Sequence, residues 1–259
     1  MTARAAAFFD LDRTLITGAS VFPFAVEAYR MGLVTNREIV RWGVSALGFK
    51  LLGDRGDATD QARSDFLGKI AGVSVEQITE IGREMLPGLV SKVRPESKRL
   101  VKMHHEAGRD TWIVSASPNG IVEALADALG MTGAIGTKGR IVDGHYTDEL
   151  DGPFVYGPGK AVAIATLAGE RGYDLASCYA YSDSVSDLPM LETVGHPVAV
   201  NPDGALEQVA YERTWPIVIF ARKTKRAVAA GSVASAAAAS VAAAYLLGRR
   251  HGRTTGIAG

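Results

Sequence analysis

The sequence is poor in cysteine and has no excess of charge of either sign. Cys178 is the single cysteine among 259 residues, so the chain cannot form an internal disulfide, which suits a reducing compartment. We interpret Cys178 as a small buried apolar side chain, because it precedes an apolar run. Lys plus Arg and Asp plus Glu number 28 each, and this balance gives no general attraction to nucleic acid, so we expect no nucleic-acid partner.

The first residues also lack the features of a signal peptide. The apolar run at 5–9 is too short for the hydrophobic part of such a peptide, and it leads straight into acidic residues. With 47% apolar and 22% charged residues, the composition excludes a disordered chain and a multi-span membrane protein. We therefore expect a cytoplasmic protein.

The C-terminal stretch at 222–259 has its own composition. Residues 222–226 are basic, the next 21 residues, 227–247, carry no charge, and three arginines follow. About 20 uncharged residues can cross a bilayer, but 11 of these 21 are Ala, which makes the segment only weakly hydrophobic. Two interpretations stay open: a helix that anchors the protein to a membrane, and an Ala-rich soluble helix or tail.

The rest of the chain predicts an α/β domain with an insertion. The apolar run at 5–9 predicts a buried strand, and from Pro95 onward strands alternate with helices. This alternation is typical of a Rossmann-like parallel sheet with helices on both faces. Between these parts, apolar residues at helical spacing predict an all-helical insertion, or cap, at 17–93. The expected catalytic core is 1–16 plus 94–221, and the four cap helices lie near 21–31, 36–52, 58–70 and 75–91.

Within the core, the sequence predicts strands at 111–114, 178–181 and 197–200. Helices are expected at 95–107, 119–129, 159–171 and 187–194, two of them closed by Gly108 and Gly130. The residues Val142-Asp143-Gly144-His145 indicate a hairpin turn within the short strands of 133–156.

Two pairs of acidic residues follow predicted strands. Asp10 and Asp12 come directly after the first strand, and Asp183 and Asp187 follow the strand at 178–181. In an open α/β sheet, ligands bind beyond the carboxyl ends of the strands. The first pair could share a hard cation or divide the roles of nucleophile and general acid–base. Helix capping could explain one residue of the second pair. It would not explain why the second pair follows a strand in the same way as the first pair does.

Two further segments carry groups that suit an anion. Ser115 ends a predicted strand, and its hydroxyl with the following backbone N–H groups would cradle oxyanions. Lys160 lies at the start of a helix, where a cation is slightly unfavourable, and this placement indicates a functional role for the lysine. Together with the acids, these groups predict a site for Mg²⁺ and a phosphoryl group.

The four ordered motifs resemble those of the haloacid dehalogenase-like hydrolases, in the branch that contains phosphoserine phosphatases. The resemblance covers about 1–205 and implies a phosphatase with a helical cap after the first motif. Asp10 resembles the nucleophile that forms an aspartyl-phosphate, and Asp12 the general acid–base. Lys160 resembles the residue that stabilises the charge on Asp10 and the phosphoryl group.

The same resemblance implies the binding residues. Thr14 corresponds to the residue that braces the loop, and Ser115 with the Ala116 N–H to the groups that bind phosphoryl oxygens. The implied cofactor is Mg²⁺, and its ligands would be Asp10, Asp12 through the backbone carbonyl, Asp183 and Asp187.

The chain departs from this family pattern at two places. Ser182 stands where many members have Gly, and no acid lies near Ala19, where phosphoserine phosphatases place one for the substrate amine. We therefore do not expect phosphoserine as the substrate. The sequence predicts hydrolysis of a small phosphorylated metabolite. The alternatives are a phosphotransferase that uses the same intermediate and a non-catalytic protein that associates with a membrane through 227–247.

Overall fold

The computed structural model describes residues 4–33 and 58–220. The helix predicted at 36–52 and the segment 227–247 lie outside these ranges, so both interpretations of the C-terminal stretch stay predictions. Within the described ranges, no helix is both long and apolar enough to span a bilayer.

A six-stranded parallel sheet forms the centre of the described part, which confirms the predicted α/β fold. The strand order is β3-β2-β1-β6-β7-β8. Strands β2 and β3 therefore lie on one side of β1, and the later strands β6, β7 and β8 lie on its other side. The strands are β1 (Ala6–Asp10), β2 (Asp110–Pro118), β3 (Gly133–Thr137), β6 (Tyr179–Ser182), β7 (His196–Val200) and β8 (Ile217–Val218).

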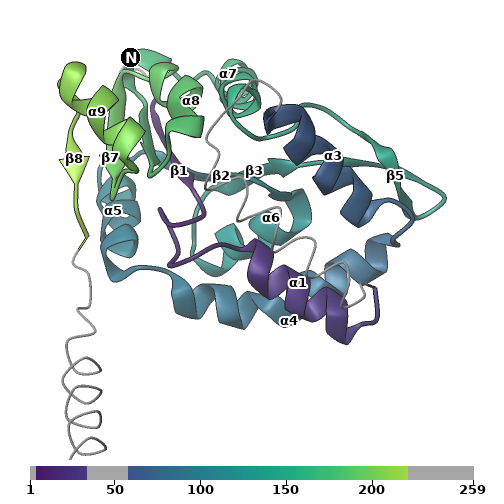
Figure 1. Ribbon diagram of the computed structural model, residues 1–259. Helices are drawn as coiled ribbons and strands as arrows, with labels where there is room; N and C mark the ends of the chain where they lie inside the picture. The colour runs from purple at the N-terminus through teal and green to yellow at the C-terminus, as the bar shows by residue number, and fades with distance from the viewer. Residues whose placement is uncertain (1–3, 34–57, 221–259) are drawn as a thin grey trace, which may run out of the picture. The chain divides into compact units, whose positions relative to one another are not determined.

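Helices cover both faces of this sheet (Figure 1). Successive side chains of β1 point to opposite faces: Phe9 packs in the cluster that includes helices α5 and α6, and Phe8 packs in the cluster with α7, α8 and α9. Both side chains are buried, as expected for a strand in the middle of a covered parallel sheet. The helices are α5 (Pro95–Glu106), α6 (Asn119–Ala128), α7 (Pro158–Arg171), α8 (Leu188–Glu192) and α9 (Gly204–Glu212).

Two predicted elements differ from the structure by more than one residue at an end. Strand β2 continues past Val114 to Pro118, because its pairing with β3 resumes at Pro118 after a register shift. The helix expected at 187–194 is shorter, since the chain first forms a 3₁₀ turn (Val185–Asp187) before α8. Helix α9 and strand β8 were not predicted. The single cysteine, Cys178, is fully buried as expected.

Helices α1 (Val21–Arg30), α3 (Ala58–Ile70) and α4 (Val75–Lys92) come from the predicted insertion. The two chain crossings that bound this stretch lie side by side, since Thr17 N donates to Lys92 O at 2.9 Å and Arg94 N donates to Leu15 O at 3.0 Å. Helix α4 begins with a capping box between Ser74 and Gln77. Its buried face packs with α6, so the insertion shares the apolar core of the sheet.

A hairpin from the second half of the chain attaches to this insertion. Strands β4 (Gly139–Val142) and β5 (His145–Leu150) pair around the predicted turn, where Asp143 and Gly144 both have positive φ. Gly72 N donates to Tyr146 O at 2.7 Å, and Tyr146 N donates to Val73 O at 2.9 Å. Val75 N donates to Gly144 O at 3.0 Å, so three backbone hydrogen bonds join the hairpin to the turn between α3 and α4.

A buried histidine makes the stability of the fold sensitive to pH. Arg109 Nε donates to His104 Nδ1 at 2.8 Å, so the proton of the neutral ring is on Nε2, which donates to Tyr181 Oη at 2.7 Å. Burial, with a smaller contribution from Arg109, lowers the pKa of His104 to about 4. Between pH ~6.5 and pH 4 the unfolded chain binds a proton at this residue that the folded chain does not.

We therefore expect the contribution of His104 to the free energy of unfolding to fall as the pH is lowered from 7 to 4.5. Denaturant unfolding of the unchanged protein and of His104→Gln, which cannot titrate at this position, isolates that contribution: the variant should gain stability relative to the unchanged protein as the pH falls. An identical change of stability in both proteins would contradict this assignment.

Candidate active site

The predicted site residues lie beside β1, where the strand order of the sheet changes direction. Strand β1 pairs with β2 on one side and with β6 on the other, so the loops that leave their carboxyl ends lie at the same edge of the sheet. Asp10 is the last residue of β1 and lies opposite Val114, which places Ser115 next along β2. Asp183 directly follows the end of β6. All three side chains are buried.

Lys160 joins two of the carboxylates. Its Nζ donates to Asp10 Oδ1 at 2.6 Å and to Asp187 Oδ2 at 2.7 Å, and the lysine side chain is only 4% exposed. Lys160 comes from the first turn of α7, whose start depends on Gly159: a Cβ there would lie 1.8 Å from Phe154 O. The close backbone approach therefore accounts for the glycine before the lysine.

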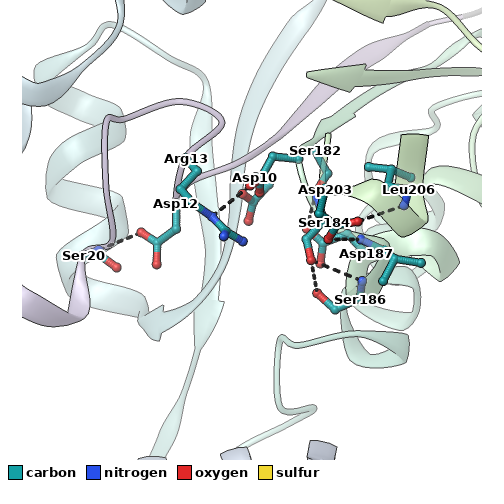
Figure 2. A network of polar contacts seen from close by, with 12 residues as sticks. Asp10, Asp12, Arg13, Ser20, Ser182, Ser184, Ser186, Asp187, Asp203 and Leu206 are labelled. Carbon is teal, nitrogen blue, oxygen red and sulfur yellow. Dashed lines mark hydrogen bonds and ion pairs between the residues drawn. The ribbon is translucent and has the colours of Figure 1, made fainter. Parts of the chain in front are cut away.

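A second cation, Arg13, contacts Asp183. Arg13 Nε lies 2.8 Å from Asp183 Oδ2, and the arginine side chain is 51% exposed. The backbone of Arg13 is left-handed, with φ 63°, and its N–H donates to Gly18 O at 3.0 Å. Figure 2 shows the guanidinium reaching from the loop after β1 toward Ser182, at the end of β6, and Asp187.

Asp12 is held by the start of the insertion. Ser20 N donates to Asp12 Oδ1 at 2.8 Å (Figure 2). Ser20 Oγ and Ser117 Oγ are 3.1 Å apart, and Ser117 N donates to Ser115 Oγ at 3.2 Å. This chain of hydrogen bonds connects the loop after β1 to the irregular part of β2.

The other two predicted residues lie beside these groups. Ala116 is in the part of β2 where the register with β3 shifts, and it is partly buried. Thr14 is buried, and its backbone carbonyl accepts a hydrogen bond from Ser97 Oγ at 2.9 Å. The Thr14 hydroxyl has no hydrogen-bond partner among the described residues. The carbonyl, and not the hydroxyl, therefore ties this loop to α5.

Burial is the largest influence on the pKa values of Asp10, Asp12, Asp183 and Lys160. Burial raises the pKa of Asp10 to about 8, although the attraction of Lys160 opposes this, and repulsion from Asp187 and Asp183 adds to it. Burial also raises the pKa of Asp183 to about 7 against the opposing effect of Arg13. The pKa of Asp12 is raised by burial, while its hydrogen bonds from Ser20 lower it. Burial acts to lower the pKa of Lys160, but its pairs with Asp10 and Asp187 outweigh burial and raise it.

The donor set fits a divalent cation in charge and in chemistry. Among the described residues two cations face four carboxylates, and the buried Asp10 needs further positive charge to stay ionised at neutral pH. All available donors are hard oxygens, which Mg²⁺ prefers. Within residues 4–33 and 58–220, no three His, Cys, Asp or Glu side chains are gathered so that they could hold a metal ion as they stand. Arg13 and Lys160 hold the carboxylates instead.

Several polar residues of the site were not assigned a role from the sequence. Ser182 Oγ donates to Asp187 Oδ2 at 2.7 Å, so the residue that departs from the family pattern orients an acid. Asp203 accepts hydrogen bonds from Val185 N at 3.0 Å and Leu206 N at 2.8 Å, and thereby fixes the loop after β6 to the start of α9 (Figure 2). An Asp before a helix is a recognisable capping signal, but its bond to another loop is not.

Comparison with known proteins gives the class of this chain. The family model of haloacid dehalogenase-like hydrolases matches residues 7–192. A probable phosphatase of Mycobacterium tuberculosis is 40% identical over 247 residues, which cover 93% of this chain and 86% of that protein. Phosphoserine phosphatase SerB1 of the same species is 38% identical over 253 residues, covering 96% of this chain and 82% of the relative. A solved structure of a Bordetella pertussis protein of unknown function has a TM-score of 0.73 and 28% identity, and the match covers 84% of this chain and 99% of that one.

The chain thus belongs to the haloacid dehalogenase-like hydrolases. Within that family it lies in the phosphoserine phosphatase-like branch, and it is a phosphoric monoester hydrolase. The alternative of a non-catalytic binding protein is therefore wrong.

Proposed function

We propose that this protein is a Mg²⁺-dependent phosphatase that hydrolyses a small phosphomonoester through an aspartyl-phosphate on Asp10. The observation that carries the proposal is the Asp10 carboxylate at the end of the central strand, where buried Lys160 binds Oδ1 at 2.6 Å. Among the described residues the other oxygen, Oδ2, accepts no hydrogen bond. That oxygen is available as a nucleophile, while Lys160 neutralises charge beside it.

Asp12 would move the proton in both half-reactions. In the first, Asp10 Oδ2 forms a bond to phosphorus, the ester P–O bond breaks, and the leaving alcohol oxygen takes the proton of Asp12. In the second, Asp12 takes a proton from water, the water oxygen bonds to phosphorus, and phosphate leaves Asp10. The raised pKa of Asp12 supports the first role, because it increases the fraction of the carboxyl group that carries a proton and can act as an acid.

The groups at the end of β2 would bind the phosphoryl oxygens. Ser115 Oγ accepts the Ser117 N–H, which leaves the proton of the hydroxyl free to donate to an oxyanion. The backbone N–H of Ala116 would donate beside it. Asp10, the Asp12 carbonyl, Asp183 and Asp187 would hold Mg²⁺, which supplies charge neutralisation for the nucleophile and the phosphoryl group when bound.

The described residues support a substrate that does not depend on an ammonium group. Ala19 stands nine residues after Asp10, Ser20 N is bound to Asp12, and the next acid, Glu27, is paired with Arg30 at 2.8 Å. The relative SerB1 is named a phosphoserine phosphatase, so phosphoserine is a necessary member of any substrate panel.

The test is phosphate release by the full chain from a panel of small phosphomonoesters with MgCl₂, including glycerol phosphates and phosphoserine. We expect turnover that is lost with EDTA and restored by Mg²⁺, and kcat/KM for phosphoserine no higher than for esters without an amine. An added alcohol separates the phosphotransferase alternative, since transfer would yield a new phosphoester in place of free phosphate. Activity that persists in EDTA would contradict the metal requirement, and a clear preference for phosphoserine would contradict the proposed specificity.

A further inference from the structure

Of the two site cations that the described part of the chain supplies, Arg13 is held less firmly than Lys160. Lys160 is 4% exposed and its Nζ donates to both Asp10 and Asp187. By contrast, within residues 4–33 and 58–220 Arg13 forms an ion pair with one carboxylate, Asp183, through Nε at 2.8 Å, and its side chain is 51% exposed. Removal of Lys160 from its partners would strand buried charges, whereas the guanidinium of Arg13 can turn into solvent and keep its hydration.

The backbone conformation at Arg13 directs its side chain toward Asp183. A left-handed residue other than Gly, Asn or Asp is unfavourable, yet Arg13 has φ 63° and its N–H is fixed by Gly18 O at 3.0 Å. Asp183 is anchored as well, because Asp203 N donates to the Asp183 carbonyl at 2.7 Å. The ion pair therefore joins two loops that are each held independently.

We propose that Arg13 is an exchangeable counter-cation of Asp183, which a divalent cation displaces when it binds. The inference rests on the proposed function, in which Asp183 is a metal ligand. A carboxylate oxygen that holds a guanidinium at 2.8 Å cannot coordinate a dication without bringing two positive centres into repulsive contact. Arg13 thus stabilises the site in the absence of metal and weakens its affinity for the metal.

The test compares Mg²⁺ binding by the full chain and its Arg13→Gln variant, measured by isothermal titration calorimetry without substrate. We expect the variant to bind Mg²⁺ about three- to tenfold more tightly, since it has no arginine to displace. Without metal, its melting temperature should be lower than that of the unchanged protein, and saturating Mg²⁺ should remove the difference. Arg13→Lys, which keeps the charge, should bind Mg²⁺ nearly as the unchanged protein does.

Arg4→Gln is a matched control. Arg4 also forms an ion pair at 2.8 Å, with Asp110, its side chain is 55% exposed, and it lies at the opposite end of the sheet. Its loss should lower the melting temperature equally with and without Mg²⁺ and leave the Mg²⁺ affinity unchanged. If Arg13→Gln and the unchanged protein bind Mg²⁺ equally well, the counter-cation role is overturned while the proposed function stands. If the unchanged protein binds no Mg²⁺, the proposed cofactor fails and this inference fails with it.

Discussion

Asp10→Asn should lower the rate of phosphate release by about 10³-fold or more and leave the protein folded. An amide is a poor nucleophile, so the covalent route is closed. The fold should persist because the substitution removes one of several crowded carboxylates, and Lys160 keeps its pair with Asp187 at 2.7 Å. The measurement is phosphate release with a thermal unfolding curve of each protein.

Asp127→Asn is the matched control for this experiment, because Asp127 lies exposed on α6, away from the site. It should retain full activity. An Asp10→Asn variant that still releases phosphate within a few-fold of the unchanged rate would overturn the nucleophile assignment.

Lys160→Met should both inactivate and destabilise the protein. The substitution keeps the length of an apolar stem but leaves two buried carboxylates, Asp10 and Asp187, without their shared cation. Removal of one partner from a buried ion pair costs about 3–5 kcal/mol of unfolding free energy. Denaturant unfolding in EDTA measures this loss, and EDTA prevents a metal from replacing the missing charge.

A second substitution tests the cause of that loss. Adding Asp187→Asn to Lys160→Met removes one of the stranded carboxylates, so the double variant should regain part of the lost stability. Lys102→Met, on the exposed surface of α5, should stay within about 0.5 kcal/mol of the unchanged protein. A Lys160→Met protein as stable as the unchanged one would show that the buried charges are not coupled as described.

Local patterns were enough to predict the sheet and the position of the acidic residues. The apolar run that ends at Asp10 can only be a covered strand in this context, and the hairpin signal at Asp143-Gly144 is strong because both residues tolerate positive φ. Strand β8 was missed because two residues, Ile217–Val218, give no periodicity. Helix α9 was missed because its preceding Pro202 and Asp203 are also typical of a plain turn.

The contacts within the site depend on the tertiary fold and were beyond local reasoning. No sequence pattern indicates that Arg13 takes a left-handed backbone, since Arg has no local preference for it. The extension of β2 through Ser115 requires the partner strand β3, which pairs again only at Thr137. The bond from Ser182 to Asp187 likewise needs the 3₁₀ turn between them.

The attachment of the β4–β5 hairpin limits how the helical insertion can swing. The two adjacent chain crossings attach the insertion to the core at one place, and the packing of α4 on α6 attaches it at a second. The three backbone hydrogen bonds donated by Gly72, Tyr146 and Val75 add a third attachment, to the β4–β5 hairpin. A displacement of α3 and α4 would therefore either break these hydrogen bonds or carry the hairpin along, with the chain bending at the short segments that flank the hairpin, Lys138 and Asp151–Gly152.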